Sequence, residues 1–348
     1  MKSNQFLLII LGIIIVSCSG KKQASETSET EEQIVNLYSH RHYDTDKELY
    51  KKFEESTGIK VNIVQASADE LITRMEAEGQ DSPADLLLTV DAGRLHRAYE
   101  KDLFQPISSE ALNQNIPSKF REPEGHWFGL TYRARIVVHD KDRVDPSELS
   151  TYEALTDPKW QGKVLIRSSS NIYNQSLMAS IIAANGKDGA KEWATGVMAN
   201  MARDPQGSDR DQMKAIVAGE GDIAVVNTYY LGLLLNSSDP EEVKVGEQMK
   251  VFFPNQEGRG AHINVSGIGV AKYAPNKENA IKLLEFLSGE EAQKVFAQVN
   301  YEYPVNPKNQ PSELLQSWGS PKFDDLNLAE LGKNNRDAVI TFDEVGWK

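Results

Sequence analysis

The residues best suited to chemistry in this sequence are tyrosines that follow short apolar runs. Tyr229 and Tyr230 come directly after the apolar run 223–226, with only Asn227 and Thr228 between. A short continuous apolar run predicts a buried strand, and ligands of open α/β sheets bind at the carboxyl ends of such strands. Taken alone, a tyrosine pair more often fills the edge of a core with its rings and turns its hydroxyls to water.

Two further strand ends change that interpretation. His42 and Tyr43 follow a second apolar run, 34–38, and Tyr173 lies in the polar segment 168–174 after a third. We predict that segment 168–174 is a loop. Three predicted strand ends therefore each present phenolic oxygen, which makes these tyrosines, with His42, candidate metal ligands.

Phenolate is a hard anionic ligand, and it selects among metal ions. The free phenol has a pKa of about 10, so only a strongly acidic cation displaces its proton at neutral pH. Magnesium and calcium prefer carboxylates, carbonyls and water, whereas zinc and copper prefer imidazole and thiolate. A site of several tyrosines and one histidine therefore points to Fe(III). Four phenolates around a trivalent ion leave one negative charge, which a guanidinium such as Arg133, Arg135 or Arg167 could balance, although each could equally form an ordinary ion pair.

The amino-terminal residues predict export and lipid attachment. Lys2 precedes an apolar stretch, 6–16, that is too short to span a membrane and is followed at once by Ser17 and Cys18. The segment 15–18 resembles the lipobox of bacterial lipoproteins, in which the cysteine is lipidated. Cys18 is the only cysteine, so no internal disulfide can form. We expect a signal peptide, a lipid anchor at Cys18, and a location in the periplasm or at the cell surface.

Charge and motif content exclude several classes of function. The net charge of -13 repels phosphate backbones and offers no basic stripe, so nucleic-acid binding is not expected. The sequence contains no Gly-x-Ser-x-Gly, no His-Glu-x-x-His and no Gly-rich phosphate loop. We therefore expect a protein that is not an enzyme, with an unrecognised secreted hydrolase as the alternative of a different class.

The first part of the chain predicts alternating strands and helices. Strands are expected at 34–38, 59–64 and 85–90, with helices begun by a cap at Thr45 and by a capping box at Ser67. Such alternation implies parallel strands joined by crossover helices. The chain is also long enough for two lobes.

A second α/β set follows at about 141–253. It contains the predicted strands 164–166 and 223–226 and a helix that begins near Ser208. Two extended segments, 127–139 and 262–273, connect the two sets and could act as a hinge, because few residues would need to change conformation.

Several motifs together give the chain a family resemblance. Segments 36–43, 129–135, 207–212 and 227–230 resemble the ferric iron-binding proteins of bacterial ABC transporters, and the Fut-type branch most of all. The resemblance covers essentially residues 34–347. It implies an α/β, two-lobed type II periplasmic binding protein fold with iron in the cleft between the lobes.

The resemblance also implies roles for single residues. Tyr43 would be the ligand from the first lobe, and Tyr173, Tyr229 and Tyr230 would be those from the second. His42 matches a position that ligates iron in some relatives and lines the cleft in others. Arg133 matches the hinge arginine, which neutralises the site or holds an anion such as carbonate. Arg135, two residues further along the same segment, is a second candidate for this role by its place in the sequence and not by the resemblance.

We therefore expect a monomeric extracytoplasmic lipoprotein that captures ferric iron and delivers it to an ABC permease. The alternative is a binding protein for another small solute or anion on the same fold, with the tyrosines forming an aromatic box. The expected organisation is a signal peptide at 1–17, a disordered tether at 18–33, one lobe from 34–131 and 267–300, a second lobe from 132–266, and C-terminal helices at 301–348.

Overall fold

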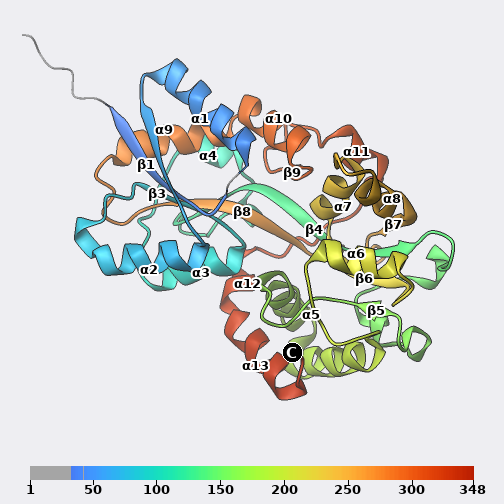
Figure 1. The fold of residues 1–348 in the computed structure, drawn as a ribbon. Coiled ribbons are helices and arrows are strands. Elements are labelled where there is room, and N and C mark those ends of the chain that lie inside the picture. Colours follow the sequence, from blue (N-terminus) through green and yellow to red (C-terminus); the bar gives the residue numbers. More distant parts are fainter. Residues whose placement is uncertain (1–32, 42) are drawn as a thin grey trace, which may run out of the picture. The chain divides into compact units, whose positions relative to one another are not determined.

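The computed structural model describes residues 33–41 and 43–348, and Gln33–Lys348 form one compact unit. The fold of this unit is drawn in Figure 1. The predicted signal peptide, Cys18, His42 and all of the predicted tether except Gln33 lie outside the described residues. Among the residues that are described, no helix combines the length and apolar character needed to cross a membrane.

Nine strands of the described chain join into one mixed sheet, with the order β2-β1-β3-β8-β4-β6-β5 and with β7 and β9 also paired to β4. The strands are β1 Ile34–Ser39, β2 Lys60–Gln65, β3 Leu86–Val90, β4 Phe128–Asp140, β5 Val164–Leu165, β6 Ile223–Asn227, β7 Met249–Phe252, β8 Ile263–Val270 and β9 Tyr303–Pro304. The α-helices are α1 Asp44–Thr57, α2 Ala68–Glu78, α3 Ala92–Glu100, α4 Glu110–Asn115, α5 Ile172–Asn200, α6 Asp209–Val217, α7 Thr228–Leu235, α8 Pro240–Gln248, α9 Lys277–Ser288, α10 Glu290–Val299, α11 Glu313–Ser317, α12 Ala329–Lys333 and α13 Asn335–Val345.

The first group of strands has the predicted parallel pairing. β1 pairs in parallel with both β2 and β3, and β8 joins the other edge of β3 in the antiparallel direction. In Figure 1, α2 and α3 lie on one side of these strands and α9 and α10 on the other. The largely apolar sequence of β3 follows from this arrangement, because every residue from Leu86 to Val90 is buried.

β4 connects the first group of strands to the second. Its residues 128–134 pair with β8, whereas residues 135–139 pair antiparallel with β6, which in turn pairs in parallel with β5. The predicted lobe boundaries at 131/132 and 266/267 fall inside β4 and β8. β4 therefore belongs to both groups of strands, and its pairing sets the positions of the strand ends in each group.

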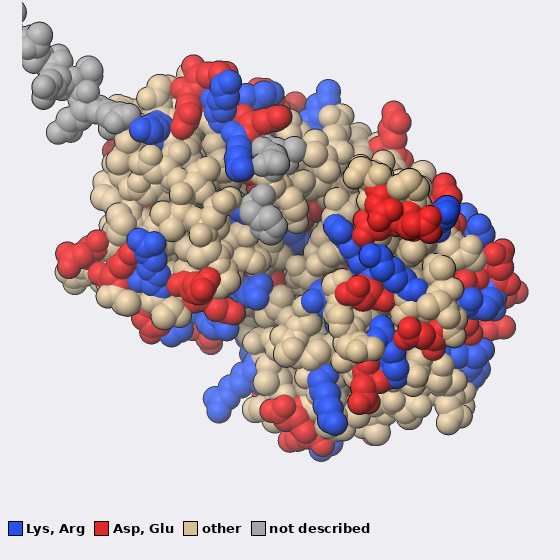
Figure 2. All heavy atoms as spheres, viewed as in Figure 1, with Lys and Arg blue, Asp and Glu red and all other residues tan. Residues whose placement is uncertain are grey.

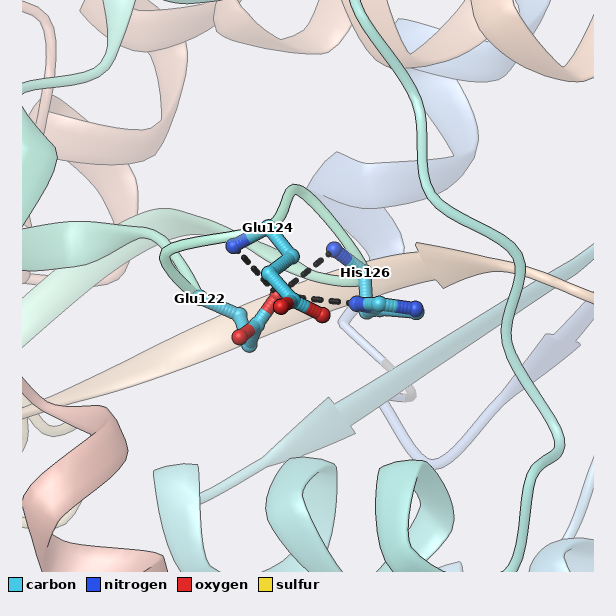
Figure 3. Close-up of side chains that lie close together, drawn as sticks. All are labelled: Glu122, Glu124 and His126. Carbon is cyan, nitrogen blue, oxygen red and sulfur yellow. Dashed lines mark hydrogen bonds and ion pairs between the residues drawn. The ribbon is translucent and has the colours of Figure 1, made fainter.

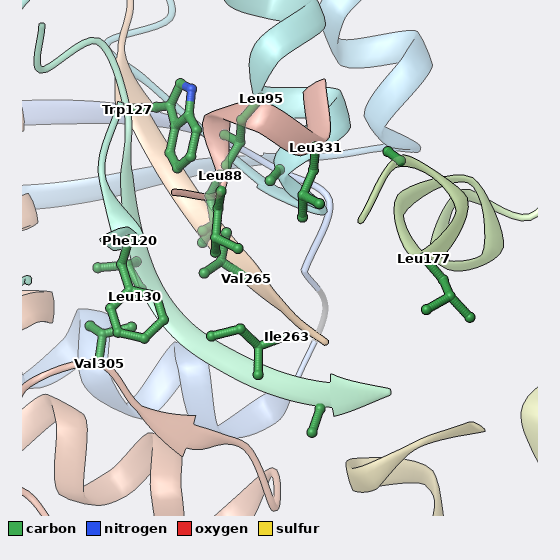
Figure 4. Close-up of a cluster of buried hydrophobic side chains, with 14 of the residues drawn as sticks. Leu88, Leu95, Phe120, Trp127, Leu130, Leu177, Ile263, Val265, Val305 and Leu331 are labelled. Atoms are coloured by element: carbon green, nitrogen blue, oxygen red, sulfur yellow. The ribbon is translucent and has the colours of Figure 1, made fainter. Parts of the chain in front are cut away.

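The hydrophobic core follows β4 and β8 through the first group and continues beneath α5. Figure 4 shows apolar side chains from β3, α3, β4, β8, α5 and α12 in one cluster. Trp127 and Leu177 are fully buried within it. On the face drawn in Figure 2, acidic and basic side chains are interspersed and form no continuous basic band.

The helix ends agree with the sequence in two of three cases. Ser67 and Ser208 each form a capping box, with Glu70 and Asp211 respectively. The prediction that Thr45 caps the first helix is wrong, because α1 begins at Asp44 with Tyr43 in the N-cap position. The chain therefore turns from β1 into α1 within the predicted site itself.

The C-terminal segment contacts both groups of strands. β9 pairs with β4, α12 packs against α3 and α5, and α13 packs along α5. The C-terminal helices expected at 301–348 are α11, α12 and α13. The buried ring of Trp347 lies 6.0 Å from Trp193 of α5 between ring centroids, which anchors the chain end.

Candidate metal-binding site

The four candidate tyrosines all lie at the start of a helix that follows a strand in the sequence. Tyr43 is the N-cap residue of α1, just after β1. Tyr173 is the second residue of α5, so the prediction that it lies in a loop is wrong. Tyr229 and Tyr230 belong to the first turn of α7, which follows β6 directly. Three helix amino termini therefore carry the phenols.

The structure brings these four phenols together although they come from three distant segments. The hydroxyl oxygens of Tyr173 and Tyr229 are 3.1 Å apart, and the ring centroids of Tyr229 and Tyr230 are 4.2 Å apart. Tyr43 is near enough to this group that its negative charge would raise the pKa of Tyr229, and that a charge on Tyr230 would raise the pKa of Tyr43. The cluster of phenols therefore combines a residue that follows a strand of the first group with residues that follow strands of the second group.

The surroundings keep Tyr43, Tyr173 and Tyr229 protonated in the absence of a cation. Burial raises the pKa of Tyr229 well above its ordinary value, and the neighbouring phenols add to the shift. Burial also raises the pKa of Tyr173 and of Tyr43, while the charge of Arg133 acts in the opposite direction on both. A cation that displaced the protons would remove the repulsion between phenolates, and the positive ends of the helix dipoles would favour the anionic oxygens.

Arg133 and Arg135 have different positions. The guanidinium carbon of Arg133 lies 6.0 Å from the Tyr229 ring centroid, beside the cluster. Arg135 contacts residues at the starts of two helices. Its Nη1 lies 2.6 Å from Asp209 Oδ2 in α6, and its Nη2 donates to Asn174 Oδ1 in α5 at 2.8 Å. Asp209 also accepts the backbone N–H of Asn227 at 2.7 Å. Arg135 is therefore placed to support the helix starts that carry the second-lobe tyrosines.

Two residues beside the cluster were not singled out from the sequence. Arg41 and Glu302 are both buried, and Glu302 forms ion pairs with Arg41 and Arg133. Burial alone would raise the pKa of Glu302, but the charges of the two arginines lower it to about 2. Arg41 precedes Tyr43 by two residues, which was a usable signal. Glu302 lies far along the chain, and nothing in its local sequence connects it with the tyrosines.

A second group of ligand-type side chains lies in the turn before β4. Glu122, Glu124 and His126 each bring one possible ligand atom within 4.8 Å of the others (Figure 3). Glu122 Oε2 already accepts the backbone N–H groups of Glu124 and His126, at 2.9 and 3.1 Å, and lies 2.9 Å from His126 Nδ1. These hydrogen bonds already engage Glu122 Oε2 and His126 Nδ1, and they stabilise the turn.

Comparison with known proteins places the chain among transport proteins. The family model described as bacterial extracellular solute-binding protein matches residues 81–325. Iron uptake protein A1 of Synechocystis is 50% identical over 342 residues, which cover 98% of this chain and 95% of that protein.

Two solved structures agree with this match. The Trichodesmium protein FutA, or IdiA, in complex with iron and citrate ligands, has a TM-score of 0.89 and 53% identity over 90% of this chain and 100% of that one. Apo FutA2 of Synechocystis has a TM-score of 0.88 and 48% identity over 91% of this chain and 100% of that one. The two-lobed periplasmic binding fold is thereby confirmed, and the relative from Synechocystis, iron uptake protein A1, is named for iron uptake rather than for an enzyme activity.

Proposed function

The chain belongs to the bacterial extracellular solute-binding proteins, and on that premise we propose that it captures ferric iron and delivers it to an ABC permease. The ligands we propose are the phenolates of Tyr43, Tyr173, Tyr229 and Tyr230. One observation carries the proposal: the phenols of three distant segments converge at one place, with Tyr173 and Tyr229 already in hydroxyl contact at 3.1 Å.

The chemistry of the donor set supports Fe(III) as the cargo. Buried phenols with raised pKa values give up their protons only to a strongly acidic cation, whereas zinc and copper favour imidazole and thiolate over phenolate. The names of the relatives point the same way. Because Tyr43 comes from the first lobe and the other three from the second, binding favours the arrangement in which the lobes are closed.

Charge balance bears on whether an anion is needed. Four phenolates and one Fe(III) leave one negative charge, and Arg133 lies beside the cluster to offset it. Arg133 is itself paired with Glu302, so its charge is already partly compensated. The proposed site needs no added anion to complete four ligands, and carbonate or a chelator such as citrate would take up any remaining coordination position. His42, outside the described residues, is the proposed fifth ligand or wall of the site.

We also propose that the mature protein is a monomer anchored through lipid on Cys18 outside the cytoplasm. This proposal rests on the lipobox-like sequence and on the extracellular family. It accounts for the single cysteine of an exported chain.

Colour provides the direct test of iron binding. Phenolate-to-iron charge transfer should make protein loaded with ferric citrate and desalted orange to purple. Tyr229→Phe and Tyr230→Phe should weaken or bleach this band, whereas Tyr273→Phe, a change at an exposed tyrosine, should leave it unaltered. A colourless loaded protein that holds no iron by metal analysis would overturn the proposal and favour another small solute.

A further inference from the structure

Tyr43 is the one proposed ligand that the first lobe supplies, and a buried arginine lies against it. The guanidinium carbon of Arg41 is 4.9 Å from the centroid of the Tyr43 ring. Only 4% of Arg41 is exposed to solvent. A stacked guanidinium at this distance restricts the ring and places a positive charge beside its π face.

Arg41 is itself held from three directions. Its Nε and Nη2 donate to the two carboxylate oxygens of Asp46 in α1, at 2.9 and 3.2 Å. Its Nη1 donates to Ser266 Oγ on β8 at 2.8 Å and to Glu302 Oε2 at 2.9 Å. Arg41 therefore links the segment between β1 and α1 to β8 through Ser266, and to the turn that follows α10 through Glu302.

Glu302 is the point where these connections meet. One of its oxygens accepts from Arg41 and, at 3.0 Å, from Thr131 Oγ1 of β4, while the other accepts from Arg133. The carboxylate is 3% exposed, so it depends on both guanidiniums to compensate its charge. Removing the charge would leave the two arginines without their common partner.

The backbone before Glu302 connects the same turn to the other tyrosines. Tyr301 has a φ of 51°, a left-handed conformation that is unfavourable for a residue with a Cβ. A Cβ placed on Gly232 of α7 would lie 2.7 Å from Tyr301 Cβ, so the ring fits only because that position is glycine. The turn that presents Glu302 to Arg41 thus also packs on the helix that carries Tyr229 and Tyr230.

We infer that Arg41 and Glu302 are positioning residues, which hold Tyr43 at the cluster so that the first-lobe ligand is in place when iron arrives. This inference rests on the proposed function. It assigns the buried ion-pair network a role in metal affinity that goes beyond support of the fold.

A double-mutant cycle tests the inference through iron affinity. Glu302→Gln, which keeps the shape of the side chain, should weaken iron binding about 10- to 100-fold, the usual effect of removing a partner that orients a ligand. The charge-transfer band should shift as it does in Tyr43→Phe. If positioning of Tyr43 is the role of the network, the double variant Tyr43→Phe/Glu302→Gln should bind iron no more weakly than Tyr43→Phe within about twofold.

Controls separate positioning from general stability. Glu122→Gln alters another buried carboxylate, away from the cluster, and should leave iron affinity unchanged. If Glu302→Gln does not fold, Thr131→Val removes one hydrogen bond to the carboxylate and should still weaken iron binding in the same cycle. Wild-type affinity in Glu302→Gln, or losses that multiply in the double variant, would overturn the inference. If Tyr43→Phe itself binds iron normally, the proposed ligand set fails instead.

Discussion

Metal binding should convert buried phenols into phenolates, and the number converted can be counted. Burial raises the pKa values of Tyr43, Tyr173 and Tyr229, so these groups are neutral at pH 7 in the metal-free protein. Deprotonating an ordinary phenol of pKa about 10 at that pH costs about 4 kcal/mol. Burial adds to this cost, and the free energy of cation binding must offset the whole of it.

The sign and size of the pH dependence follow from that count. A phenol that binds the metal as phenolate releases its proton, so affinity for the metal falls as the pH falls. With about four protons displaced per ion, a drop of one pH unit should weaken binding by about four powers of ten, before the chelator's own protonation is considered. Acid should therefore release the metal over a narrow pH range.

Gallium(III) is a suitable probe, because it is trivalent and gives no visible charge-transfer band that would obscure the phenolate absorption. Titration into the metal-free protein should produce the ultraviolet difference spectrum of four tyrosinates per bound ion. Tyr229→Phe should produce three, and Tyr273→Phe, at an exposed position, should produce four. Binding without a tyrosinate spectrum, or equal spectra in wild type and Tyr229→Phe, would refute the reasoning.

Three further outcomes are expected. Cys18→Ser should leave the fold intact by circular dichroism but move the protein from the membrane fraction to the soluble fraction, and continued membrane retention would contradict lipidation. His42→Ala should raise the pH of acid release modestly if His42 is a ligand, whereas an unchanged release curve would make it a wall of the site. Trp347→Ala should destabilise the protein by about 3–5 kcal/mol in urea unfolding, since the ring is 3% exposed and packs on Trp193 and Phe342; a loss below about 1 kcal/mol would show that α13 is not anchored there.

Local sequence predicted the elements well where a short-range signal exists. The apolar run 223–226 became β6, and the capping box at Ser67 began α2, because burial of a strand and satisfaction of helix N–H groups are local requirements. The prediction failed at Tyr173. Its polar segment has the composition of a loop, but Asn171 caps a helix there by accepting from the Tyr173 N–H.

The sequence by itself determined which oxygen donors the protein carries and that they follow strand ends, since residue type and apolar runs are written along the chain. Only the tertiary structure decided that the four phenols meet, and that Glu302 forms an ion pair with Arg41, which lies 261 positions earlier in the sequence. Such contacts depend on how β4 and β8 pass between the two groups of strands. Strand pairing and register over that distance arise from the packing of the whole core, which no local pattern encodes.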